Sequence, residues 1–263
     1  MIIKDLVKLH DPQNQFDVLV KTYEQIEFAW NNKFDVSSAG NKKYNNMVIA
    51  GLGGSAISAD LIANFLHDEL TIPLTVVRGY HLPSFADENT LLICSTYSGN
   101  TEETNSVLEE GYKKACTIIC ITTGGKAGKY AAEKQIPVVA VKAGYQPRYA
   151  LGVSFFSVLK VIQQIGLIKD QFSYVDKILK LWKENGVHYS AENNAAYKYA
   201  EQLVGFVPLI YSAADLTSAV GYRFKCQLNE NSKVHAFSGV LPELNHNEII
   251  GWETFNPSQL NIK

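Results

Sequence analysis

The segment richest in chemistry is Ser95-Thr96-Tyr97-Ser98-Gly99-Asn100-Thr101, where hydroxyl groups crowd around a glycine. It follows an apolar run and precedes a polar run of helical character. One interpretation is structural: Asn100 caps the next helix, and Glu103, three residues later, completes a capping box. Capping needs only one or two of these groups. The remaining hydroxyls suit the oxygens of a phosphate, and they belong to Thr96, Ser98 and Thr101.

A second candidate anion site is Gly51-Leu52-Gly53-Gly54-Ser55, between the apolar run MVIAGL and the amphipathic run AISADLIANFL. Glycines let the backbone approach a ligand, and a helix start presents free N–H groups and the positive end of its dipole. A glycine turn of this kind is as often only a turn. The carboxyl ends of parallel strands meet at one edge of a sheet, so both segments are expected to hold one phosphomonoester.

Five apolar runs without inside/outside alternation predict the sheet that positions these turns. Such runs are typical of parallel strands buried on both faces, and the spacing between them fits helical crossovers. The expected fold class is α/β, with a five-stranded doubly wound parallel sheet over residues 36–152. The runs are residues 47–52, 74–79, 90–95, 117–122 and 137–141.

The rest of the chain predicts helices and a second, smaller α/β unit. A helix is expected at about 11–33 within an N-terminal helical segment, 1–35. Connecting helices are expected within 153–190. Residues 191–263 show two strand-like runs, 207–212 and 234–239, separated by a helical stretch. This predicts a second domain with too few strands to match the first sheet.

Composition excludes several classes of function. The 263 residues are 46% hydrophobic and 19% charged, with a net charge of -2 and no run of five like charges, so neither a nucleic-acid surface nor a membrane patch is expected. No segment has about 20 uninterrupted apolar residues. The four cysteines form no CxxC pair, which favours reduced thiols and a cytoplasmic protein. Histidines and cysteines lack metal-ligand spacing, so no metal is expected.

Five motifs in this order resemble the bifunctional phosphoglucose/phosphomannose isomerases, which are built from two SIS (sugar isomerase) domains. The motifs are GLGGSAISADL, STYSGNTEET, PRYALG, QLNENSK and PELNHNEIIGW, spanning about residues 45–252. The resemblance implies interconversion of glucose 6-phosphate, and of mannose 6-phosphate as a second candidate, with fructose 6-phosphate. The implied route is a cis-enediol proton transfer that needs no metal or cofactor, within glycolysis and gluconeogenesis.

The resemblance also assigns roles to residues. Thr96, Ser98 and Thr101 match the phosphate loop, and the loop formed by Gly53, Gly54 and Ser55 closes on the sugar. Without the resemblance, Glu230 would be interpreted as a solvated carboxylate at a helix end and His246 as a surface imidazole. Arg148 would be interpreted as a structural cation at the start of a helix. In the family, the matching residues are the catalytic base, the ring-opening histidine and the arginine that stabilises the enediolate. The histidine reaches the site from the partner subunit of a homodimer.

Two other functions stay open from the residues. An NADP-dependent oxidoreductase is favoured by the spacing of Gly51, Gly53 and Ala56, with Arg78 placed to pair with a 2′-phosphate. A non-catalytic sugar-phosphate sensor is the other, although no basic recognition helix is present. Family members continue past the position of Lys263, so the sequence predicts weak or no activity for the 263-residue chain.

Overall fold

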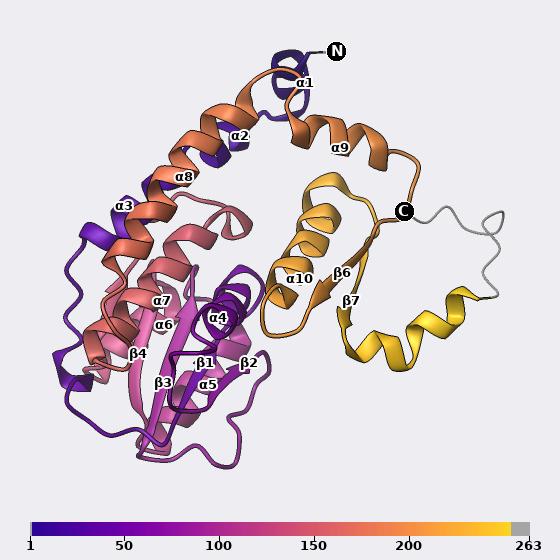
Figure 1. Ribbon diagram of the computed structural model, residues 1–263. Helices are drawn as coiled ribbons and strands as arrows, with labels where there is room; N and C mark the ends of the chain where they lie inside the picture. The colour runs from indigo at the N-terminus through magenta and orange to yellow at the C-terminus, as the bar shows by residue number, and fades with distance from the viewer. Residues whose placement is uncertain (1, 254–263) are drawn as a thin grey trace.

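A five-stranded parallel sheet forms the centre of the protein, whose computed structural model describes residues 2–253 (Figure 1). The strand order is β2-β1-β3-β4-β5, which is that of a doubly wound sheet. The predicted fold class is therefore confirmed, with strand ends within two residues of expectation. The strands are β1 (Asn46–Ala50), β2 (Leu74–Val77), β3 (Thr90–Thr96), β4 (Thr117–Thr122) and β5 (Val138–Ala140).

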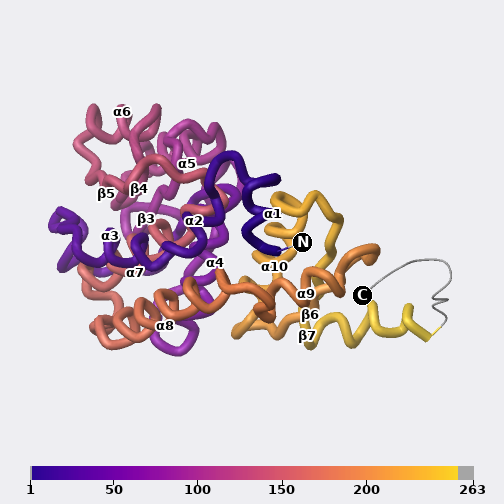
Figure 2. Tube along the Cα trace, turned by 90° about the horizontal axis from the view of Figure 1, so that it is seen from above, coloured from indigo at the N-terminus to yellow at the C-terminus, as the bar shows by residue number. Residues whose placement is uncertain are grey.

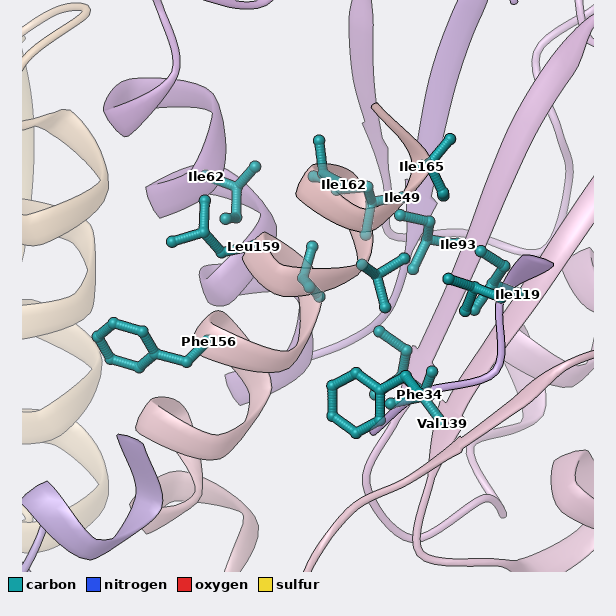
Figure 3. Packing of buried hydrophobic residues seen from close by; sticks show 14 of the residues in the cluster. Phe34, Ile49, Ile62, Ile93, Ile119, Val139, Phe156, Leu159, Ile162 and Ile165 are labelled. Carbon is teal, nitrogen blue, oxygen red and sulfur yellow. The ribbon is translucent and has the colours of Figure 1, made fainter. Parts of the chain in front are cut away.

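Alternate residues of β1, β3 and β4 enter two separate cores, one on each face of the sheet. Ile49 and Ile93 pack toward α7 (Leu151–Ile165), and Figure 3 shows Ile49 beside Ile162. The same core takes side chains of α4 (Gly54–Phe65) and α8 (Phe172–Ser190). Val48 and Cys94 face the other core, below α5 (Glu102–Lys113) and α6 (Gly125–Glu133). Burial on both faces explains why the strands are continuously apolar.

The N-terminal segment is helical but is not the single helix that periodicity predicts. It forms α1 (Ile3–His10), α2 (Gln15–Val20) and α3 (Tyr23–Asn31). The break lies at Thr22, whose hydroxyl donates to the carbonyl oxygens of Val18 at 3.1 Å and Leu19 at 2.7 Å. A side chain that satisfies carbonyls at a helix end competes with the next turn of helix. Apolar spacing alone does not reveal that competition.

The later part of the chain lies beside α4 and carries a second sheet. Strands β6 (Leu209–Ala213) and β7 (Phe237–Leu241) pair in parallel, and α10 (Ser218–Gln227) connects them. Helix α9 (Ala195–Leu203) precedes β6. Figure 2 shows this unit to one side of the first sheet, and Asn64 Oδ1 of α4 accepts a bond from the amide of Ala219 at 3.1 Å. The domain boundaries expected from the sequence stay predictions.

No helix among residues 2–253 combines the length and apolar character needed to cross a membrane.

Candidate active site

The turns after β1 and β3 adjoin at the carboxyl edge of the sheet. Ala50 pairs with Cys94 in register, which puts Gly51 beside Ser95. A Cβ atom on Gly51 would lie 2.8 Å from the carbonyl oxygen of Ser95, so only glycine fits there. The two candidate anion segments therefore share one edge, as the sequence predicts.

In the turn after β3, hydroxyls lie next to each other at the start of α5. Thr96 is buried, and its Oγ1 donates to Oγ1 of Thr101 at 3.2 Å. Thr101 is the N-cap of α5, but its side chain accepts no capping bond. Ser98 is exposed, with Oγ accepting the Asn100 amide at 3.2 Å. These hydroxyls adjoin the free amides of a helix start, where an anion is stabilised.

The predicted cap at Asn100 is wrong by one residue. Its Oδ1 instead accepts the backbone amide of Lys126 at 3.2 Å, at the start of α6. Gly99 makes this crossing possible: its φ is +70°, and a Cβ atom there would lie 1.8 Å from the carbonyl oxygen of Gly124. The capping-box pattern is local, whereas this contact forms only when β4 lies beside β3.

The first turn leads into α4, whose start abuts the segment that carries Arg148. Gly53 precedes the helix with φ +54°, and Ser55 in its first turn is buried. A Cβ atom on Gly54 would lie 2.8 Å from the carbonyl oxygen of Pro147, in the 3-10 helix η2 (Pro147–Tyr149). The glycine-rich turn therefore touches the arginine segment directly.

Long-range hydrogen bonds from several elements hold η2. Gln25, buried in α3, donates from Nε2 to the carbonyl oxygen of Tyr149 at 2.7 Å. The Arg223 guanidinium of α10 donates to the carbonyl oxygen of Arg148, and burial lowers the pKa of Arg223. The Tyr149 hydroxyl donates to Oδ1 of Asn231 at 3.0 Å. Sequence analysis missed Gln25 and Arg223, which carry no local signal.

Tyr97 links the phosphate turn to the same region. Its hydroxyl donates to the carbonyl oxygen of Lys142 at 2.9 Å and accepts the Tyr145 amide at 2.9 Å. Burial raises the pKa of Tyr97, so the phenol stays protonated at neutral pH. The Tyr97 side chain thus connects the turn after β3 to residues 142–145, which lead into η2.

Glu230 lies in η3 (Leu228–Ser232), a π-helix that continues from α10. Short π-helical turns occur frequently at functional sites because they reorient single side chains. Lys233, which follows η3, donates from Nζ to the carbonyl oxygen of Glu230 at 2.6 Å. The Glu230 carboxylate itself is on an exposed residue.

Arg148 and Glu230 line one pocket of about 420 Å³, within the range of small-ligand sites. Nε of Arg148 is buried there and has no hydrogen-bond partner among the described residues. The pocket lining includes neither glycine-rich nor hydroxyl-rich turn; the pocket and the turns meet at η2, through the contact of Gly54 with Pro147.

His246 is not brought to Arg148 and Glu230 within one chain. It is exposed, in the 3-10 helix η4 (Glu243–His246) that follows β7, and it is absent from the pocket lining. Arg78, the residue that could receive a 2′-phosphate, forms an ion pair with Asp60 of α4. That ion pair already engages the guanidinium that a 2′-phosphate would need. Among residues 2–253, no three His, Cys, Asp or Glu side chains gather as metal ligands would.

Comparison with known proteins places this geometry in a family. Residues 192–263 match the family described as "Bacterial phospho-glucose isomerase C-terminal SIS domain". A solved structure, a putative phosphosugar isomerase from Clostridium difficile 630, superposes with a TM-score of 0.67 at 15% identity. The match covers 93% of this chain and 72% of that one, and shows a shared fold.

Two curated relatives are named bifunctional phosphoglucose/phosphomannose isomerase. The one from Caldicellulosiruptor bescii is 37% identical over 244 residues, covering 91% of this chain and 72% of the relative. The one from Aquifex aeolicus is 37% identical over 219 residues, covering 83% of this chain and 65% of the relative. The chain thus spans roughly two thirds of the length of these relatives. At this identity and coverage, the chain belongs to the bifunctional phosphoglucose/phosphomannose isomerase family.

Proposed function

We propose that the protein interconverts glucose 6-phosphate, and mannose 6-phosphate as a second aldose, with fructose 6-phosphate. One observation carries the proposal: η2 joins both halves of the site. Its Arg148 lines a pocket with Glu230, and its Pro147 abuts the glycine-rich start of α4 beside the hydroxyl-rich turn. An anion site next to a carboxylate and a guanidinium is what a phosphosugar isomerase needs.

The phosphate would be held by the two turns. Thr101 and Ser98 supply hydroxyl donors, the amides at the start of α5 supply further donors, and the loop of Gly53, Gly54 and Ser55 closes on the sugar. Thr96 holds Thr101 through its hydrogen bond and leaves the Thr101 proton free for a phosphate oxygen. Neutral donors suit a ligand that must also be released.

The chemistry is a proton transfer between C2 and C1 of the open sugar. Glu230 removes the C2 proton of the aldose and, after exchange with solvent, delivers a proton to C1, while the hydroxyl proton of O2 is lost and O1 is protonated; an enediolate forms between the two steps. The Arg148 guanidinium stabilises the negative oxygen of that enediolate. His246, supplied by the partner subunit of a homodimer, opens the pyranose ring. The reaction needs no metal or cofactor, and its place is cytoplasmic carbohydrate metabolism.

The test follows deuterium from D2O into fructose 6-phosphate by NMR, together with appearance of the aldose. Wild type is expected to incorporate deuterium at C1, at a low rate in keeping with the weak activity predicted for the 263-residue chain. Glu230→Gln should lower the rate at least about 100-fold because the base is lost. Glu184→Gln changes an exposed carboxylate on α8 and should match wild type. Absence of exchange in wild type, or full exchange in Glu230→Gln, contradicts the proposal.

A further inference from the structure

The pocket that holds Arg148 and Glu230 has a second wall, which no motif predicts. This wall is the N-terminal segment α1–α2, residues 3–20, and it contributes most of the lining. Figure 1 shows α1 above the C-terminal end of α10, where the chain enters η3. A ligand that reaches the carboxylate of Glu230 through this pocket must therefore contact α1–α2.

The wall is fixed to the rest of the protein at several points. Glu192 caps the start of α1, its carboxylate accepting the Ile3 amide at 2.8 Å and the Lys4 amide at 3.3 Å. Between α1 and α2, the Gln146 side-chain amide donates to Oε1 of Gln13. Gln146 directly precedes η2, so this contact sets the wall against the arginine segment.

Within the wall, His10 is the residue suited to bind a polyol. The carboxylate of its neighbour Asp11 already accepts the amides of Gln15 at 2.9 Å and Phe16 at 2.7 Å. The exposed His10 imidazole makes no hydrogen bond or ion pair to the described residues. An imidazole ring has two nitrogen atoms, which can hydrogen-bond two adjacent sugar hydroxyls.

The other histidines lie outside the pocket that contains Arg148 and Glu230. His67 lies 4.0 Å from Asp68, His81 lies 3.7 Å from Glu110, and His188 packs on the Tyr189 ring. His10 is the one histidine in the lining of the pocket shared by Arg148 and Glu230. In the same lining, Arg148 Nε and Gln15 Oε1 are buried polar atoms without partners among the described residues. These polar groups can hydrogen-bond sugar hydroxyls, and they lie among the apolar side chains of Leu6, Val7, Phe16 and Leu19 in the same lining.

We propose that α1–α2 forms the sugar-facing wall of the active site and that His10 hydrogen-bonds hydroxyls of the bound hexose 6-phosphate. The inference rests on the proposed function and adds a substrate-binding residue from the same chain. His10 holds the sugar across the pocket from Arg148 and Glu230, so that C1 and C2 face the carboxylate.

Histidine footprinting tests the contact independently of turnover. Carbethoxylation by diethyl pyrocarbonate is followed residue by residue with mass spectrometry. Saturating fructose 6-phosphate should slow modification of His10 about fivefold or more, while inorganic phosphate should not. His188 should react equally under all conditions. Equal modification of His10 with and without a bound hexose phosphate overturns the inference.

Kinetics with a matched pair of variants separates this inference from the proposed function. His10→Gln is expected to raise KM for fructose 6-phosphate about tenfold with a smaller change in kcat, since binding to the sugar is lost. His188→Gln should leave both constants unchanged. If wild type is active and His10→Gln has the same KM and kcat, the role of His10 is contradicted while the proposed function stands. A wild type that neither binds nor converts hexose phosphates contradicts the proposed function and, with it, the sugar wall.

Discussion

The Tyr149 hydroxyl donates a 3.0 Å hydrogen bond to Oδ1 of Asn231 and so joins the segment of Arg148 to the π-helix of Glu230. Each partner is the sequence neighbour of a proposed active-site residue. The bond therefore couples the position of the guanidinium to that of the carboxylate, across two parts of the fold that also meet where α10 contacts α4 and η2.

Tyr149→Phe is expected to lower kcat/KM about three- to tenfold, because one hydrogen bond is worth about 0.5–1.5 kcal/mol. The loss should appear mainly in kcat, since phosphate binding lies elsewhere. Steady-state isomerisation kinetics measures it. Tyr199→Phe, an exposed tyrosine of α9, serves as the control. A Tyr149→Phe enzyme with unchanged kcat would mean that the coupling has no part in catalysis.

Thr101→Val should weaken binding of inorganic phosphate about tenfold or more, since a hydrogen bond to a charged group is worth about 1.5–3 kcal/mol. Isothermal titration calorimetry gives the dissociation constant. Thr104→Val is a close control, because Thr104 is buried in α5 and its Oγ1 has no partner among the described residues. That variant should bind phosphate like wild type. Equal affinities in both variants would place the phosphate away from this turn.

Gly99→Ala should destabilise the fold by at least about 2 kcal/mol, because it combines a strained φ of +70° with a 1.8 Å contact to backbone. Urea unfolding measures the free energy. Gly128→Ala, in the middle of α6, has 3.6 Å to its nearest neighbour, Thr122. It should remain within about 1 kcal/mol of wild type, on the stabilising side. A mild effect at Gly99 would contradict the close packing of the turns after β3 and β4.

Cys94 and Cys120 should resist alkylation in the folded protein. Both are fully buried, and burial raises the pKa of Cys94 well above its usual value and that of Cys120 to about 12. Reaction requires the thiolate, so iodoacetamide at pH 8 should label them only after unfolding. Cys226, half-buried on α10, is the internal comparison. Peptide mass spectrometry measures the extent of alkylation at each cysteine.

The sign of the associated pH effect follows from the same burial. A raised thiol pKa means that folding favours the protonated form. The stabilisation is complete below the unfolded pKa near 8.5 and declines as the pH rises toward about 12. Unfolding free energies for Cys120→Ala should therefore fall less steeply than wild type between these limits. A wild-type protein whose unfolding free energy changes with pH as little as that of the variant would contradict this prediction.

Local pattern was enough to determine the sheet and the turns. The runs at β1 and β3 are apolar throughout because parallel strands are buried on both faces. The glycine-rich and hydroxyl-rich segments directly follow these strands, at the sheet edge where ligands bind in doubly wound folds. Family resemblance named Arg148, Glu230 and His246, and the structure brings the first two to one pocket. The position of His246 in a dimer stays a prediction.

Tertiary structure alone decided what surrounds those residues. Gln25 holds η2 from a helix more than one hundred residues earlier, Asn100 crosses to α6 instead of capping α5, and His10 lines the pocket from α1. Sequence periodicity reports which face of an element is buried, and it carries no information on which distant backbone group a polar side chain will meet. Those partners exist only once the sheet order and the packing of the N-terminal helices are set.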